Sequence, residues 1–84
     1  MKKLVLVSGS SRGLGASIAR TFIENDYQVA INYYNSEDKA LELVKELGSS
    51  ARAYKADVSN LEEVKSMISA IEKDFGNSPS ILVN

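Results

Sequence analysis

Three glycines lie close together near the start of the chain, in the segment Ser8-Gly9-Ser10-Ser11-Arg12-Gly13-Leu14-Gly15. They follow a short apolar run at residues 4–7 and precede a stretch with helical periodicity, which predicts a strand, a turn and a helix. Glycine has no Cβ, so the backbone can turn tightly and approach a pyrophosphate closely. A helix beginning at Gly13 would direct its free N–H groups at that phosphate. A purely structural turn between a strand and a helix would need only one glycine. The three glycines therefore indicate a phosphate-binding turn.

The spacing of these glycines separates the turn from other phosphate-binding loops. A Walker loop ends in Gly-Lys-Ser/Thr, and this segment has no such ending. The spacing G-x-x-x-G-x-G also differs from the commoner G-x-G-x-x-G fingerprint. A dinucleotide is the ligand that this strand, turn and helix predict.

Apolar runs and helical periods alternate along the chain and predict the element order βαβαβαβ. Strands are expected at residues 4–7, 29–31, 51–56 and 81–83, with Asn32 to Asn35 as a loop. Ser36 is expected to cap the second helix, and Ser59 with Glu62 to form a capping box on the third. The expected inner faces of the helices are Leu14, Ile18, Ala19, Phe22 and Ile23, then Ala40, Leu41, Val44 and Leu47, then Leu61, Val64, Ile68, Ile71 and Phe75.

Alternating strands and helices are typical of a parallel sheet with right-handed crossovers. The expected fold class is therefore a Rossmann-type α/β fold with three layers, α/β/α, and the strand order 3-2-1-4. The 84 residues of the chain would form one half of such a domain.

The composition excludes several classes of site and partner. The chain has no cysteine and no histidine, which excludes disulfides and Cys/His zinc sites, and no metal site is expected. Its net charge of −1 provides no basic surface for nucleic acid or anionic lipid. The apolar run at residues 4–7 is too short for a signal peptide or a membrane helix, so a cytoplasmic location is expected.

Four features spread over the chain resemble the amino-terminal part of the short-chain dehydrogenase/reductase family. The first is the glycine segment, in which Ser8 stands where the family usually has threonine. The second is Asp57-Val58, which is similar to the family's acidic position near the adenine ring. The third, residues 81–84, resembles the start of its Leu-Val-Asn-Asn-Ala-Gly segment. The fourth, residues 32–34, resembles the 3-oxoacyl-(acyl carrier protein) reductase branch.

The resemblance implies a nicotinamide dinucleotide, and the charged residues favour NADP(H) over NAD(H). An NAD enzyme usually ends its second strand with Asp or Glu, whereas Asn32 and Tyr33 are neutral and an amide can donate to a 2′-phosphate. Arg12 stands where a guanidinium could hold that phosphate in a bidentate pair. The residues expected at the cofactor are Gly9, Ser11, Arg12, Gly13, Leu14, Gly15, Asn32, Tyr33, Asp57, Val58 and Asn84.

Simpler roles remain open for three of these residues. Arg12 could be a solvated loop residue, Asp57 a turn residue and Asn84 a strand end without a ligand.

The family's catalytic Ser and Tyr-x-x-x-Lys pair have no counterpart here, because none of the four tyrosines has a lysine four positions later. No catalytic residue is assigned, and the chain is expected to be the NADP(H)-binding half, residues 1–84, truncated before the catalytic half. The resemblance implies a full-length homo-oligomer that reduces a ketone or 3-oxoacyl thioester.

Two alternative functions predict different sequence features. A non-catalytic dinucleotide-binding module or sensor would lack the downstream Tyr-x-x-x-Lys. An S-adenosylmethionine-dependent methyltransferase would need an acid after the second strand, and different glycine spacing.

Overall fold

The computed structural model describes residues 2–9 and 13–83, and these form four strands and three helices in the order βαβαβαβ. The elements are β1 (Leu4–Ser8), α1 (Gly13–Glu24), β2 (Gln28–Tyr33), α2 (Glu37–Leu47), β3 (Ala51–Lys55), α3 (Leu61–Phe75) and β4 (Ile81–Val83). This order confirms the one expected from the sequence.

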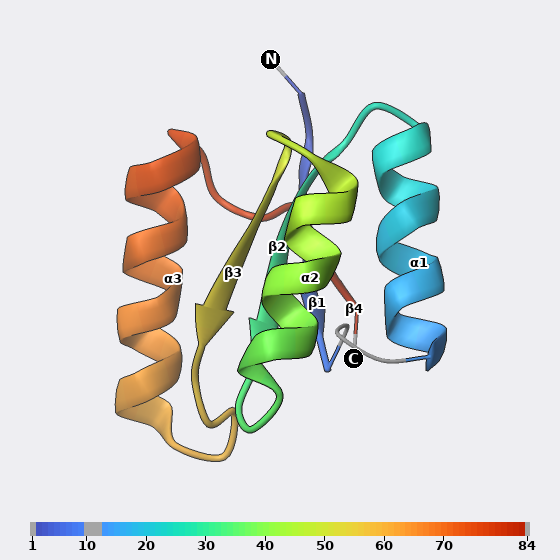
Figure 1. The fold of residues 1–84 in the computed structure, drawn as a ribbon. Coiled ribbons are helices and arrows are strands. Elements are labelled where there is room, and N and C mark those ends of the chain that lie inside the picture. Colours follow the sequence, from blue (N-terminus) through green and yellow to red (C-terminus); the bar gives the residue numbers. More distant parts are fainter. Residues whose placement is uncertain (1, 10–12, 84) are drawn as a thin grey trace.

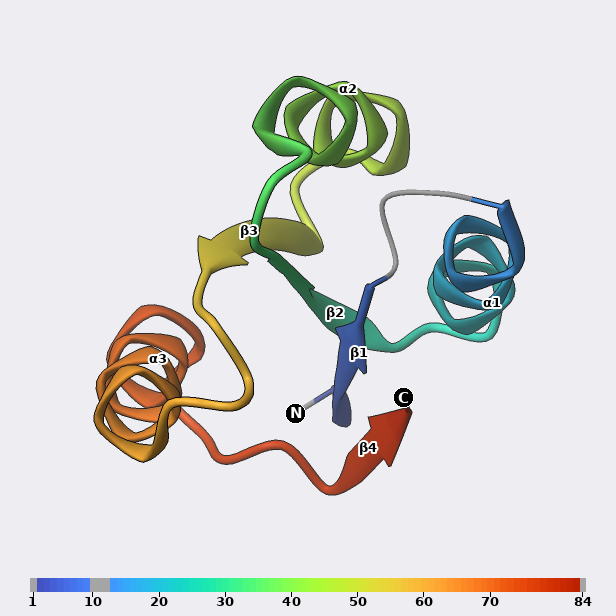
Figure 2. The same ribbon diagram turned by 90° about the horizontal axis from the view of Figure 1, so that it is seen from below.

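All strand pairs are parallel, and the sheet order is β3-β2-β1-β4, which confirms the Rossmann-type fold. Helices α1 and α2 cover one face of the sheet and α3 covers the other (Figures 1 and 2). The carboxyl ends of the strands and the amino ends of the helices meet at one edge, at the bottom of Figure 1. In this class of sheet, ligands bind at that edge.

Strand alternation divides the core into two layers. Val5, Val7, Val29 and Ile31 face α1 and α2 in one cluster. The neighbouring strand residues Leu4, Leu6 and Ala30 pack against α3 in the other. Successive side chains of a strand point to opposite faces, so both faces of β1 and β2 must be apolar to be covered by helices.

Three leucines that the sequence analysis placed on buried helix faces are exposed instead: Leu14 (78%), Leu41 (54%) and Leu61 (65%). In α2 the fully enclosed positions are Ala40 and Leu43. Leu41 follows Ala40 by one residue, which turns it about 100° away on a helix of 3.6 residues per turn. Sequence periodicity alone does not separate Leu41 from the apolar helix face next to it.

The expected inner faces of α1 and α3 are otherwise largely confirmed. Ile18, Ala19, Phe22 and Ile23 of α1 belong to one core cluster, and Ile68, Ile71 and Phe75 of α3 belong to the other. Small residues, Ala16 and Ala19, bring α1 against the sheet. In α3 the buried residues are Met67 and Ile71, and the sequence analysis had omitted Met67.

The start of α3 is one residue later than the expected capping box. Asn60, not Ser59, is the N-cap, and its side chain accepts a hydrogen bond from the N–H of Glu63. Ser36 precedes α2 as expected but makes no side-chain capping bond. Gly48 and Gly76 end their helices as expected, with Gly76 in the left-handed conformation at φ 78°.

The two faces of α2 provide a matched test of the packing. We expect Leu43→Ala to lower the free energy of unfolding by about 2–5 kcal/mol, because Leu43 is enclosed. The chemically identical Leu41→Ala should change it by no more than about 0.5 kcal/mol, because Leu41 faces solvent. Urea unfolding of both variants measures the difference, and equal losses would contradict this orientation of α2.

Candidate functional site

The glycine turn begins directly after β1 and leads into α1. Gly9 has φ +66° and Gly13 has φ +48°, conformations that residues with a side chain adopt at a cost. A Cβ built on either glycine meets nothing within 4 Å, so the space beside both is open. These glycines are therefore required by backbone conformation, and they leave room for a group to approach the backbone. Ser11 and Arg12 lie outside the described residues, as does Asn84.

The amino end of α1 differs electrostatically from those of α2 and α3. The first turn of α1 contains no acidic residue. By contrast, α2 begins with Glu37 and Asp38, and α3 carries Glu62 and Glu63 in its first turn. Acidic side chains there neutralise the positive end of the helix dipole. Among the three described helices, α1 alone has no acidic side chain in its first turn, which fits an anionic ligand such as a pyrophosphate.

Leu14 and Gly15, both expected at the cofactor, lie in the first turn of α1. Together with Gly9 they line a hollow of about 150 Å³ against the ends of β1 and β4. The exposure of Leu14 is thus explained by its place at the mouth of this hollow. Here the structure brings together three of the residues that the sequence analysis selected.

Asn32 corrects the sequence analysis in two respects. It lies inside β2, not in a loop, and is only 3% exposed. Its side-chain Nδ2 donates to the backbone carbonyls of Ala56 (3.1 Å) and Tyr54 (3.3 Å). The amide hydrogens are directed at protein carbonyls, so the expected hydrogen bond from Asn32 to a 2′-phosphate is wrong for this geometry.

Tyr33 also belongs to β2, and its side chain turns toward α2. It is 9% exposed. Its hydroxyl donates to Glu37 Oε2 at 3.0 Å. The structure therefore separates Tyr33 from the hollow beside Leu14, while its neighbour Tyr34 is half exposed.

Asp57 lies just after β3 and orders the turn that leads into α3. Its Oδ1 accepts hydrogen bonds from the backbone N–H of Ser59 at 2.9 Å and from the Ser59 hydroxyl at 2.6 Å. Its own N–H donates to Glu63 Oε1 at 3.0 Å. The two bonds from Ser59 lower the pKa of the Asp57 carboxyl. Asp57 therefore has the structural role in the turn that the sequence left open. Both bonds from Ser59 end on Oδ1, and neither involves Oδ2.

A second hollow, of about 240 Å³, lies beside this turn. Its lining combines Ser8, Asn32 and Val58 with apolar side chains from β1, α3 and β4. Val58, another residue expected at the cofactor, is exposed at its rim. The hollow lies at the same sheet edge as the glycine turn, so the two hollows flank the end of β1.

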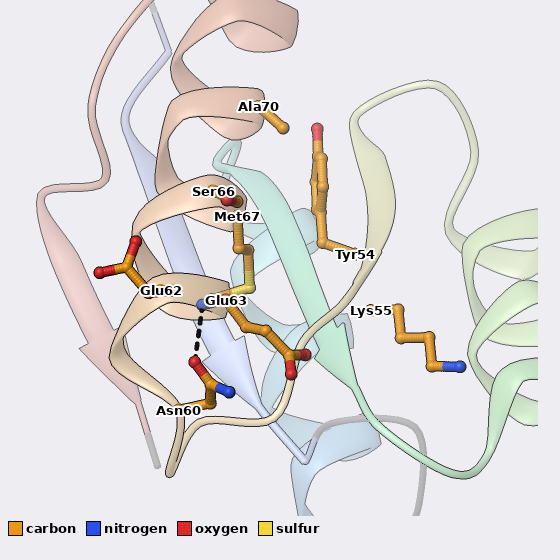
Figure 3. A pocket seen from close by; sticks show the side chains of 8 residues that line it. All are labelled: Tyr54, Lys55, Asn60, Glu62, Glu63, Ser66, Met67 and Ala70. Atoms are coloured by element: carbon orange, nitrogen blue, oxygen red, sulfur yellow. Dashed lines mark hydrogen bonds between the residues drawn. The ribbon is translucent and has the colours of Figure 1, made fainter.

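A larger hollow, of about 360 Å³, lies elsewhere, between β3 and α3. Figure 3 shows Lys55 and Glu62 pointing in opposite directions there, with Tyr54 and Met67 between them. None of its lining residues is among those selected for the cofactor. The described residues expected at the cofactor, except Tyr33, lie instead toward the carboxyl edge of the sheet, around the ends of β1 and β3.

Sequence reasoning missed the partners that hold Asn32, namely Ser8 and the carbonyls of Tyr54 and Ala56 at the end of β3. Strand alternation could have shown only that Asn32 is buried, because it follows Ala30 by two residues and so shares its buried face.

The residues that the structure describes contain no group of three or more acidic, histidine or cysteine side chains arranged to hold a metal. Nor is any helix in the described ranges long and apolar enough to cross a membrane.

Comparison with known proteins agrees with this geometry. The family model described as short chain dehydrogenase matches residues 3–84. The whole chain is 45% identical to the 3-oxoacyl-(acyl-carrier-protein) reductase FabG of Staphylococcus epidermidis and 44% identical to that of Staphylococcus aureus, covering 35% of each. It is 39% identical, over 98% of its length, to a probable NADP-dependent mannitol dehydrogenase of Yarrowia lipolytica, covering 30% of that protein.

The chain belongs to the short-chain dehydrogenase family. It spans about a third of the length of the curated relatives it matches.

The hydrogen bonds at Asp57 can be tested by titration. We expect Ser59→Ala to raise the pKa of Asp57 toward its ordinary value, because the hydroxyl donor is lost while the backbone donor remains. Carboxyl NMR titration measures this change. Because folding depresses the pKa, the stabilisation is present above the unfolded value and is lost as pH falls through the folded value.

Ser66→Ala, on the exposed surface of α3, is the matched control and should leave Asp57 unchanged. An Asp57 pKa that is the same in wild type and Ser59→Ala would show that the bond from the Ser59 hydroxyl does not form.

Proposed function

We propose that residues 1–84 form the NADP(H)-binding portion of an oxidoreductase. The observation that carries the proposal is the uncompensated amino end of α1, which meets two glycines of positive φ at the carboxyl edge of β1. A pyrophosphate placed there would accept hydrogen bonds from the first-turn N–H groups and interact favourably with the helix dipole. The open space beside Gly9 and Gly13 is what such close approach requires.

The remaining residues have proposed roles around this anchor. Ser11 and Gly15 belong to the pyrophosphate turn, and Leu14 would contact the dinucleotide from the mouth of its hollow. Asp57 would accept a hydrogen bond near the adenine through Oδ2, with Val58 beside the ring. Asn84, which follows β4, would line the crevice. When bound, the nicotinamide supplies hydride chemistry, and this chain's residues bind and orient it.

NADP(H) is proposed over NAD(H) on the basis of charge. The last two residues of β2, Asn32 and Tyr33, supply no carboxylate to hold a ribose 2′-hydroxyl or repel a 2′-phosphate. Arg12 offers a guanidinium in the glycine turn. One relative is named as an NADP-dependent mannitol dehydrogenase, which supports the same choice.

The proposed reaction of the whole protein is reduction of a ketone or 3-oxoacyl thioester to the alcohol. The support is the name of the relatives that are 44–45% identical, 3-oxoacyl-(acyl-carrier-protein) reductase. The chain has no Tyr-x-x-x-Lys pair, so we assign no catalytic residue within it. We further propose that the protein acts in the cytoplasm as a homo-oligomer. A protein that binds NADPH but reduces no such substrate would favour the alternative, a dinucleotide-binding module or sensor.

Arg12 provides the sharpest test of the cofactor. We expect Arg12→Ala to weaken NADPH binding by roughly 1.5–3 kcal/mol, the usual range for charged hydrogen bonds, and to leave NADH binding nearly unchanged. Isothermal titration with each cofactor measures both affinities. Arg20→Ala is the matched control, because Arg20 lies on α1 but pairs with Glu46 of α2.

Equal losses for NADPH and NADH in Arg12→Ala would contradict the proposed phosphate contact. A wild-type protein that binds neither cofactor would contradict the proposed function itself.

A further inference from the structure

Asn32 joins the carboxyl ends of three neighbouring strands through one buried side chain. Its Oδ1 accepts a hydrogen bond from the Ser8 hydroxyl at 3.2 Å, at the end of β1. Its Nδ2 lies 3.1 Å from the carbonyl of Ala56 and 3.3 Å from that of Tyr54, at the end of β3. Asn32 itself is the register partner of Ser8 on one side and of Tyr54 on the other.

The residues that Asn32 holds are the immediate neighbours of the two cofactor loops. Ser8 precedes Gly9, and the N–H of Gly9 donates to the Asn32 carbonyl at 3.2 Å. Ala56 precedes Asp57. One residue thus fixes the start of the glycine turn and the start of the Asp57 turn relative to each other.

We propose that Asn32 is a positioning residue that sets the distance between the glycine turn and the Asp57 turn, and that it does not touch the cofactor. This rests on the proposed function, because the two turns are the proposed pyrophosphate and adenine sites. Hydrogen bonds weaken steeply as their distances and angles depart from ideal values, so a displaced turn would hold the ligand less well. Pyrophosphate and adenine are common to NADPH and NADH, so a loss of position should affect both cofactors alike.

The chemistry of the amide explains why this position is not acidic. The side chain must accept one hydrogen bond from Ser8 while it donates to carbonyl oxygens. A carboxylate could accept from Ser8, but its second oxygen would face the carbonyls of Ala56 and Tyr54 without a proton to share. Buried acceptors placed against one another are unfavourable.

The test compares Asn32→Asp with wild type in dissociation constants for NADPH and for NADH, measured well below the unfolding temperature on protein with native near-ultraviolet circular dichroism. We expect both constants to rise roughly tenfold, as for the loss of one or two ligand hydrogen bonds, with their ratio unchanged. Unchanged constants in the folded variant would reduce Asn32 to a structural role. A ratio shifted toward NADH would show that position 32 contacts the ribose, and either result overturns the proposal.

Ser8 supplies a second, milder variant in case Asn32→Asp does not fold. Ser8→Ala removes the donor to Asn32 Oδ1 and should weaken both cofactors by roughly threefold, while Ser8→Thr keeps a hydroxyl and should bind like wild type. Equal affinities for Ser8→Ala and Ser8→Thr would overturn the proposal. Failure of the wild type to bind either cofactor would instead refute the proposed function, so the two failures are distinguishable.

Discussion

The parallel pairing of β1 with β2 is the constraint on which the rest of the molecule depends. Its register sets Ser8 opposite Asn32, so both strands end at the same edge of the sheet. Because the strands are parallel, every connection must cross over through a helix, and each helix begins again at that edge. The apolar faces of β1 and β2 require α1 and α2 on one side and α3 on the other. The position of the glycine turn at this edge is therefore a consequence of packing.

Electrostatics then distinguishes one helix end from the other two. Acidic first turns partly neutralise the positive ends of α2 and α3, and Asn60 also caps α3 with its side chain. The first turn of α1 has no such acid, and the turn before it uses positive-φ glycines. This difference is why we propose the anion site at α1, among three helix ends that the fold places at one edge. Helix ends and hollows of similar size are common, whereas this combination of charge and backbone conformation occurs once in the described chain.

The order of elements and the sheet topology could be predicted from the sequence, because apolar runs and helical periods reflect burial directly. Finer assignments failed where periodicity does not determine orientation. Leu41 and Leu43 are equally apolar, yet only contact with the sheet decides that Leu43 is enclosed. Asn32 looked like a loop residue because it is polar, but its hydrogen bonds to backbone carbonyls allow it to continue the strand. Its partners lie 24 residues away in either direction, at Ser8 and Ala56, so only the folded chain shows them.

The central claim is that a dinucleotide binds at the carboxyl edge of β1, between the glycine turn and the Asp57 turn. Hydrogen–deuterium exchange of the protein with and without NADPH tests this most directly. The account predicts slower exchange at residues 9–16 and 57–60, with little change at Ser66 and Ala70 beside the larger hollow of Figure 3. Protection confined to that larger hollow, or no protection at the first turn of α1, would contradict it.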